Sequence, residues 1–322
     1  MTIGIQNIAF HLPANRQDNA AICAAHEFDE AFIADKLGIN ARYIAGPDES
    51  TADLATAAAR ALLDASGVSA DKIGLLMVVT QTPDYCLPHT SALVHAALGL
   101  AKSVAAFDVN LGCSGFVYGL STAIGFMEAN GIDFGILVTA EEYSKVMDPA
   151  DRATAPLFGD GAAATLLSRT PQYAIGRTTF GTDGSRHEAL IVPGSGTRAG
   201  DASPLAMEGR AIFNFMMSEV PGDVSTCLER NGLGIDDIDA WVFHQASKFM
   251  LQSVAKRIGI AQDKVVIDLE DGGNTTSSTI PIALARKVFA LEAPPRRIFL
   301  SGFGVGLSWA STVITMSETP ES

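Results

Sequence analysis

The sequence predicts an α/β protein built from two similar halves, and repeated segments carry this prediction. Residues 63–81 (LDASGVSADKIGLLMVVTQ) and 228–246 (LERNGLGIDDIDAWVFHQA) share Leu, Gly, Asp and Ile in step. In both segments a helical pattern ends at a glycine, a short polar turn follows, and an apolar run indicates a buried strand. Strands that alternate with helices indicate sheets covered by helices on both faces.

The repeat continues along the chain. Residues 103–115 (SVAAFDVNLGCSG) and 264–278 (KVVIDLEDGGNTTSS) each predict a strand, a turn of small residues and the start of a helix. Residues 134–140 (FGILVTA) and 297–303 (RIFLSGF) each predict a buried strand. Chance similarity between ordinary strand–helix units is the alternative interpretation.

The shift between the repeated segments is about half of the 322-residue chain. We therefore expect an N-terminal half, residues 1–170, and a C-terminal half, residues 171–322. If the halves pack about a pseudo-twofold axis, the ends of equivalent strands meet at the seam between them.

Composition excludes several classes of function. The formal charge is −14, so a nucleic-acid-binding surface is not expected. No apolar run approaches the roughly 18 residues that span a membrane, and no signal-peptide pattern opens the chain. The histidines and the four cysteines (Cys23, Cys86, Cys113 and Cys227) show no metal-ligand spacing. We therefore expect a cytoplasmic protein without a metal and without disulfides.

Cys113 is a candidate nucleophile because it lies in a short turn of small residues within an apolar run. It lies between a predicted strand and a predicted helix, with Gly112 and Gly115 nearby. At the first turn of a helix, free N–H groups and the helix dipole would favour the thiolate. Inert packing is the alternative, since buried cysteines commonly act as small apolar side chains.

Two polar residues lie at comparable junctions in the other half. His244 follows the strand AWVF, where a neutral imidazole could exchange or donate a proton. Asn274 follows Gly272 and Gly273, and its amide could orient an oxyanion. The alternatives are structural: His244 could cap a helix or bind a buried carbonyl, and Asn274 could be a turn residue.

The motifs that hold these residues are similar to those of a known family. The chain resembles the β-ketoacyl-acyl carrier protein synthase III family in GCSGF around Cys113, HQA after His244 and GGNT around Asn274. Residues 148–167 (DPADRATAPLFGDGAAATLL) and the terminal SGFGVGLSW add to the resemblance. It implies a thiolase-like, five-layered α-β-α-β-α fold, a catalytic Cys113–His244–Asn274 set and a homodimer.

The resemblance also implies a reaction. Cys113 would take an acyl group from acyl-CoA, and His244 and Asn274 would bind the thioester carbonyl of malonyl-acyl carrier protein during decarboxylation. The N–H groups of Cys113 and Gly306 would form the oxyanion hole for the acyl group. A dinucleotide loop is the alternative for Gly304 and Gly306 in GFGVG, but a strand-like pattern follows them instead of a helix.

Further residues are expected around the substrate. Phe32 and Arg152 match positions that hold the CoA adenine in the family. Lys36 matches a position where arginine is common. Gly304 would let the backbone approach the substrate. Leu87 matches a position from which the partner subunit walls the acyl pocket. These matches imply no cofactor besides the thioester substrates, and they leave the acyl donor open.

A basic patch is expected near the entrance because acyl carrier proteins are acidic and this chain is too. Lys248, Lys256 and Arg257 lie on the predicted helix after His244 and are the candidates. An ordinary solvated helix face is the alternative. Two further functions stay open at this stage: an acyltransferase that does not condense, and a silent partner subunit of another condensing enzyme.

Overall fold

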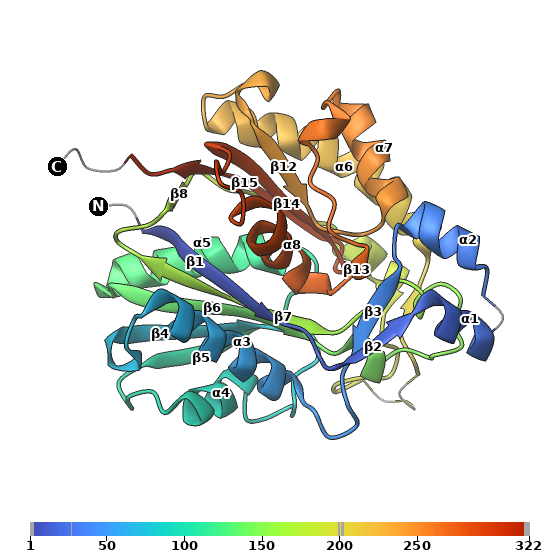
Figure 1. Cartoon of the computed structure of the whole chain (residues 1–322), viewed down its shortest axis with the longest axis horizontal. Helices are drawn as coiled ribbons and strands as arrows, with labels where there is room; N and C mark the ends of the chain where they lie inside the picture. Colours follow the sequence, from blue (N-terminus) through green and yellow to red (C-terminus); the bar gives the residue numbers. More distant parts are fainter. Residues whose placement is uncertain (1–2, 27, 199, 201–202, 319–322) are drawn as a thin grey trace.

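The computed structural model describes residues 3–26, 28–198, 200 and 203–318. Its helices form three layers that enclose two layers of strands (Figure 1). One outer layer contains α3 (Thr51–Ser66) and α4 (Thr90–Leu98). The middle layer contains α5 (Gly115–Asn130) and α8 (Thr279–Ala283). The other outer layer contains α6 (Gly209–Arg230) and α7 (Lys248–Ile258).

The first strand layer belongs to the N-terminal part of the chain. Its strands lie in the order β5 (Ala105–Val109), β4 (Ile73–Val79), β6 (Phe134–Glu141), β7 (Gly161–Ser168) and β1 (Gly4–His11). β4 pairs in parallel with β5 and β6, whereas β7 is antiparallel to β6 and β1. β4 and β7 are almost entirely buried, as expected for strands with helices on both faces.

The second strand layer repeats this order. β12 (Ala240–Phe243) is parallel to β14 (Arg297–Gly304), which is antiparallel to β15 (Ser308–Met316). β15 then pairs with β8 (Tyr173–Ile175) and β9 (Thr179–Thr182). A parallel bridge between Trp241 and Val265 occupies the place that β5 holds in the first layer.

The two strand layers are connected at β8. This strand pairs with β1 on one edge and with β15 on the other, so one hydrogen-bonded path runs through both layers. The predicted boundary between residues 170 and 171 falls in the connection from β7 to β8. Residues 1–2 and 319–322, at the outer ends of the predicted halves, lie outside the described residues.

The repeated helix ends have the predicted backbone. Gly67 directly follows α3 with a φ of 65°, and Gly232, shortly after α6, has a φ of 67°. Both values are in the left-handed region, which favours glycine. At the other end of α3, Ser50 and Asp53 form a capping box.

The middle layer joins the core of both halves. Phe116 and Leu120 of α5 are fully buried, and they belong to one apolar cluster with Val79, Val242 and Ile280 from both parts of the chain. Helix α5 is therefore central, as its apolar pattern predicts. The fold is the predicted five-layered α-β-α-β-α arrangement.

The other strands form two smaller sheets. One contains β13 (Asp271–Gly272), β3 (Ala41–Ile44) and β2 (Asn15–Asp18), and the other contains β10 (Leu190–Ile191) and β11 (Ala206–Met207). The remaining α-helices are α1 (Asn19–His26) and α2 (Glu30–Phe32). In the part of the chain that the structure describes, no helix is long and apolar enough to cross a membrane.

Candidate active site

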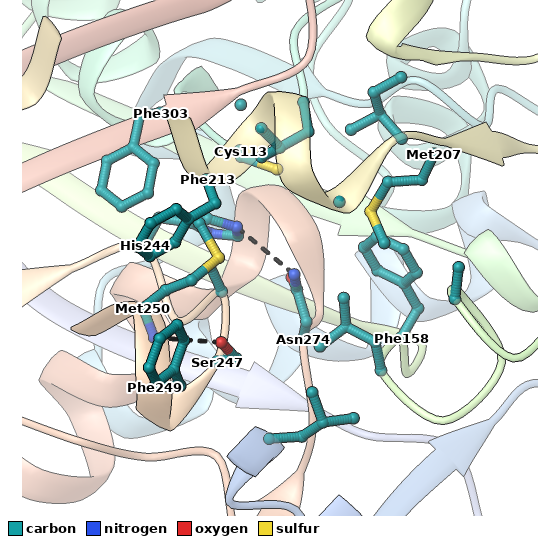
Figure 2. A pocket seen from close by; sticks show the side chains of 18 of the residues that line it. Cys113, Phe158, Met207, Phe213, His244, Ser247, Phe249, Met250, Asn274 and Phe303 are labelled. Atoms are coloured by element: carbon teal, nitrogen blue, oxygen red, sulfur yellow. Dashed lines mark hydrogen bonds between the residues drawn. The ribbon is translucent and has the colours of Figure 1, made fainter. Parts of the chain in front are cut away.

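Cys113, His244 and Asn274 come from three separate junctions and line one cavity of about 320 Å³. Cys113 lies between β5 and α5, His244 directly follows β12, and Asn274 lies between β13 and the turn Thr276–Ser278. Figure 2 shows the three side chains around the same space. All three are at least 96% buried in the chain, so the cavity reaches deep into the seam between the two strand layers.

Glycines on β14 make room for Cys113. A Cβ at Gly304 would lie 2.7 Å from the Cys113 Cβ and 2.8 Å from its Sγ. A Cβ at Gly302 would lie 2.7 Å from the Cys113 carbonyl oxygen and 2.8 Å from the Ser114 Cα. Because real Cβ atoms do not approach so closely, these two glycines let the start of α5 pack directly on β14.

The position of Cys113 differs from the expected one. Helix α5 begins at Gly115, with Ser114 as its N-cap, so Cys113 precedes the first turn. Burial, followed by the nearby Glu141 charge, raises the pKa of the Cys113 thiol to about 12, although the backbone of Val305 lowers it. For the free protein the pKa of the thiol therefore moves opposite to the expectation that the helix start favours the thiolate, because desolvation outweighs the nearby backbone N–H groups.

Glu141 is the titratable carboxyl whose charge acts on Cys113. At the end of β6 it is fully buried, and it accepts hydrogen bonds from Gln81 N–H, Thr82 Oγ1 and Ser277 Oγ, each at 3.1 Å. Burial raises the pKa of its carboxyl to about 8, against these donors. Since Ser277 follows Asn274 closely in the chain, Glu141 ties the Asn274 loop to the N-terminal strands.

His244 is held from the side opposite to the cavity. Its Nδ1 lies 2.7 Å from Thr279 Oγ1, and its ring meets the Phe303 ring edge-on, with centroids 5.8 Å apart. Burial lowers the pKa of His244 to about 3, although the backbone of Thr276 raises it. The imidazole is therefore neutral at physiological pH. Ser247, and not His244, caps helix α7.

Asn274 has a fixed amide orientation. Its Oδ1 accepts the Thr276 N–H at 2.9 Å, which turns Nδ2 toward His244 Nε2 at 3.5 Å. Its backbone is bonded to the segment before β7, through Leu157 O at 3.0 Å and the Gly159 N–H at 3.1 Å. The two catalytic candidates therefore present nitrogen atoms that converge on one point of the cavity.

Comparisons with known proteins identify the family of this chain. Family models described as 3-oxoacyl-[acyl-carrier-protein (ACP)] synthase III and its C-terminal part match residues 107–184 and 228–316. The chain is 36% identical to β-ketoacyl-[acyl-carrier-protein] synthase III of Lactococcus lactis subsp. cremoris, over 97% of this chain and 98% of the relative. The chain belongs to the 3-oxoacyl-[acyl-carrier-protein] synthase III family.

Solved structures of synthase III proteins have the same fold. The 3-oxoacyl-(acyl carrier protein) synthase III of Pseudomonas aeruginosa superimposes with a TM-score of 0.91 at 31% identity, and each chain is covered completely. The priming β-ketosynthase of the R1128 polyketide pathway gives a TM-score of 0.89 at 30% identity, over 99% of this chain and 97% of that chain. The resemblance predicted from the motifs is confirmed, and so are the thiolase-like fold and the assignment to an enzyme family.

Two of the expected CoA-binding residues lie at the cavity entrance. Phe32 and Arg152 both line the cavity, and the Phe32 side chain is 50% exposed. Phe213 and Phe249, which the sequence did not suggest, also line it and stack with ring centroids 5.5 Å apart. Lys36 is exposed in the π-helical turn Ile33–Leu37, four residues after Phe32, and does not line this cavity.

The other expected substrate residues divide into two groups. Gly304 lines the cavity beside Cys113. Gly306 follows β14 with a φ of 137° but does not line the cavity. Leu87 is 83% exposed and lies away from the cavity of its own chain. Leu87 therefore does not line the cavity of its own chain. Gly306 lies two residues after Gly304, which lines the cavity, and its N–H stays a predicted donor to the acyl oxyanion.

The expected basic patch follows helix α7 away from the entrance. Phe249 and Met250, in the first turn of α7, line the cavity. Lys256 and Arg257 are exposed in the last turn, roughly 12 Å further along the helix axis. Lys248 is half-buried, and its side chain packs against the backbone of Gly38. Among the described residues, no group of three His, Cys, Asp or Glu side chains could hold a metal ion.

Proposed function

We propose that this protein joins an acyl group, held on Cys113, to malonyl-acyl carrier protein with loss of carbon dioxide. The product is a β-ketoacyl-acyl carrier protein. One observation carries the proposal: a buried thiol and two converging nitrogen atoms, from His244 and Asn274, share one largely apolar cavity. This set supplies a nucleophile and two donors, which are the groups that a decarboxylative condensation requires.

In the first half-reaction Cys113 Sγ attacks the carbonyl carbon of an acyl-CoA. The acyl–sulfur bond to CoA breaks, CoA leaves as a thiol with the Cys113 proton, and an acyl-cysteine thioester remains. Backbone N–H groups of Cys113 and Gly306 would bind the developing oxyanion. Because the free thiol is desolvated, we expect substrate binding to contribute to its activation.

In the second half-reaction the malonyl thioester loses its carboxylate as carbon dioxide. The electron pair of the broken carbon–carbon bond enters an enolate, whose oxygen accepts hydrogen bonds from His244 Nε2 and Asn274 Nδ2. The enolate carbon then attacks the acyl-cysteine and expels the Cys113 thiolate, which takes a proton from solvent. No cofactor beyond the two thioesters is needed, since the departing carboxylate supplies the electron pair.

The test separates the half-reactions. Wild type should gain one acyl mass per chain from acyl-CoA, mapped to the Cys113 peptide, and Cys113→Ala should gain none, whereas Cys23→Ala should behave as wild type. His244→Ala and Asn274→Ala should still acylate but should each lose about 10²–10³-fold or more in malonyl decarboxylation, since each removes an oxyanion donor. Undiminished condensation in Asn274→Ala would refute this mechanism. Acyl transfer to an alcohol or amine that tolerates Asn274→Ala, with no condensation in wild type, would favour an acyltransferase that does not condense.

The proposed partners are acyl-CoA and acyl carrier protein. The acyl carrier protein would dock on the basic residues of α7, Lys248, Lys256 and Arg257, with its thioester arm passing Phe249 into the cavity. A silent partner subunit is the remaining alternative, and one acyl mass on Cys113 would exclude it. Fatty acid initiation and a dedicated secondary pathway are both compatible with this chemistry.

We also propose a homodimer. β5 pairs only with β4 in the described chain, and its five residues are all half-buried, which is unusual for a strand beside a large core. Leu87 and Tyr85, in the loop before α4, are 83% and 59% exposed. A second copy that covers β5 would remove this free edge and would bring apolar side chains toward the partner. The four free cysteines favour a cytoplasmic location for this dimer.

A further inference from the structure

The hydroxyl of Thr279 contacts His244 but has no role in the reaction proposed above. It is 97% buried at the start of α8, and its hydroxyl lies between two groups. Oγ1 is 2.7 Å from His244 Nδ1 and 3.0 Å from the Thr276 carbonyl oxygen. A hydroxyl has one proton, so it can donate to only one of these two groups at a time.

The choice decides what His244 can do in the cavity. The imidazole is neutral, so one ring nitrogen carries a proton and the other does not. If Thr279 donates to the Thr276 carbonyl, Nδ1 must carry the proton and donate to Oγ1, and Nε2 becomes an acceptor. If Thr279 donates to Nδ1, the proton is on Nε2, which then faces the cavity as a donor.

Two observations favour the second arrangement. The Thr276 carbonyl already accepts the backbone N–H of Thr279, so it keeps a donor without the hydroxyl. His244 Nε2 and Asn274 Nδ2 are 3.5 Å apart, which is long for a donor and an acceptor, since such pairs usually lie near 2.9–3.0 Å. Two N–H donors that are both directed at the position of one substrate oxygen would have such a separation.

We propose that Thr279 is a positioning residue that donates its hydroxyl proton to His244 Nδ1 and thereby holds the tautomer in which Nε2 carries the proton. This inference rests on the proposed function, in which Nε2 donates to the enolate oxygen. Thr276 contributes to the same arrangement on the other side, because its N–H fixes the Asn274 amide. One short turn thus prepares both donors.

The tautomer can be observed directly. In protein with ¹⁵N-labelled histidine, the His244 signals are assigned by their loss in His244→Ala, and the two ring nitrogens are then compared near neutral pH. We expect Nε2 to carry the proton in wild type and in Thr279→Ser. A wild-type imidazole with its proton on Nδ1 would overturn the inference.

Kinetics of the half-reactions provide the second test. Thr279→Val keeps the shape of the side chain but removes the hydroxyl. We expect malonyl decarboxylation to fall by roughly 10²-fold, as when one oxyanion donor is lost, while acylation of Cys113 stays near the wild-type rate. Thr279→Ser should restore most of the decarboxylation. Thr275→Val, at a neighbouring buried threonine outside the hydrogen bonds of His244, should leave both rates near normal.

The outcomes separate this inference from the proposed function. If His244→Ala and Asn274→Ala condense normally, the proposed function fails. If those variants lose condensation but Thr279→Val condenses as well as Thr279→Ser, only the role of Thr279 fails. A Thr279→Val protein that has lost both half-reactions, with a lower melting temperature than Thr279→Ser, would assign Thr279 to folding alone and would also overturn the inference.

Discussion

The two strand–helix junctions of the site have the same place in the fold but different construction. In the N-terminal half, α5 is a 16-residue helix that begins just after Cys113, and glycines of β14 clear the space around the thiol. In the C-terminal half, α8 has 5 residues and is preceded by the turn Thr276–Ser278. The Thr279 hydroxyl, at the start of α8, contacts His244, and the Thr276 N–H in the turn holds Asn274. A nucleophile needs free space, whereas a donor needs a fixed direction.

The largest expected effect follows from filling the space beside the nucleophile. Gly304→Ala would place a Cβ within 2.8 Å of Cys113 Sγ, so the start of α5 must shift. We expect Cys113 acylation to fall by about 10²-fold, the cost of misplacing a reacting group by about 1 Å. Single-turnover acylation followed by intact mass measures this rate.

The control for this variant is a glycine inside the helix that follows Cys113. Gly125→Ala lies within α5, where an added Cβ would meet no atom within 4 Å. It should acylate normally and should be slightly more stable, since alanine favours helix over glycine. Equal acylation in both variants would show that the space beside Cys113 is not limiting.

The next effect concerns the carboxyl that ties the two junctions together. The pKa of Glu141 is raised to about 8 from an ordinary value near 4.5. The stability that its protonated form provides is therefore complete below the unfolded pKa and is lost as the pH rises through 8. Glu141→Gln should not show this loss, so the free energy of unfolding of the variant relative to wild type should rise by on the order of 3–4 kcal/mol between about pH 5 and pH 8.

Urea unfolding of both proteins across this pH range measures the difference between their free energies of unfolding. Any effect of the substitution that does not depend on pH shifts this difference equally at every pH, so it does not alter the change with pH. Burial also raises the pKa of Glu142 to about 7, and Glu141 is not among the causes of this shift. We therefore expect the Glu142 titration to be common to both proteins and to cancel in the difference. A pH-independent difference between wild type and Glu141→Gln would show that Glu141 does not titrate in the range.

A smaller effect is expected at the helices that follow the junctions. In the C-terminal half, α7 ends with Lys256 and Arg257. Reversing both to glutamate should raise the KM for malonyl-acyl carrier protein roughly tenfold and weaken its salt dependence, while acylation by acyl-CoA stays near normal. The equal charge change Lys72→Glu with Lys102→Glu, at exposed residues of the N-terminal half, should leave the KM unchanged; the same KM in both double variants would place the docking site elsewhere.

The smallest effect concerns the loops that precede α4 and α7. The loop before α7 lines the cavity of its own chain at Ala246 and Ser247, whereas the loop before α4 exposes Leu87. If Leu87 reaches a partner's pocket, Leu87→Phe should lower kcat/KM for the longest accepted acyl-CoA by about fourfold, the worth of one buried methylene. An unchanged chain-length profile, with the dimer intact by light scattering, would remove Leu87 from the pocket.

Sequence reasoning located the elements of the site because periodicity and repeated motifs are local. The strand before His244, the strand after Gly304 and the helix from Lys248 to Ile258 all have the predicted type. The five layers follow from repeated strand–helix units, but only the family resemblance named the arrangement.

Contacts between distant segments could not be predicted in the same way. The sequence pattern around Thr279 indicates only a helix residue. Its hydroxyl contacts His244 because of the conformation of the segment that precedes α8. The pKa of Cys113 depends on burial by β14 and on Glu141, which no local pattern reports. Lys36 matches a family position, but the residues that line the cavity depend on how the surrounding turns fold, and Lys36 is not among them.

The pairing of β8 with both β1 and β15 has a consequence for how substrates move. Tyr173 pairs with Ile5 on one edge and with Met316 on the other, so the strand layers share a continuous ladder of backbone hydrogen bonds. A hinge between the halves would have to break that ladder, which makes opening of the seam a costly route to Cys113. Long, thin substrates must instead thread past Phe32 and Phe249, and turnover will depend on how fast a flexible thioester arm enters and leaves a rigid channel.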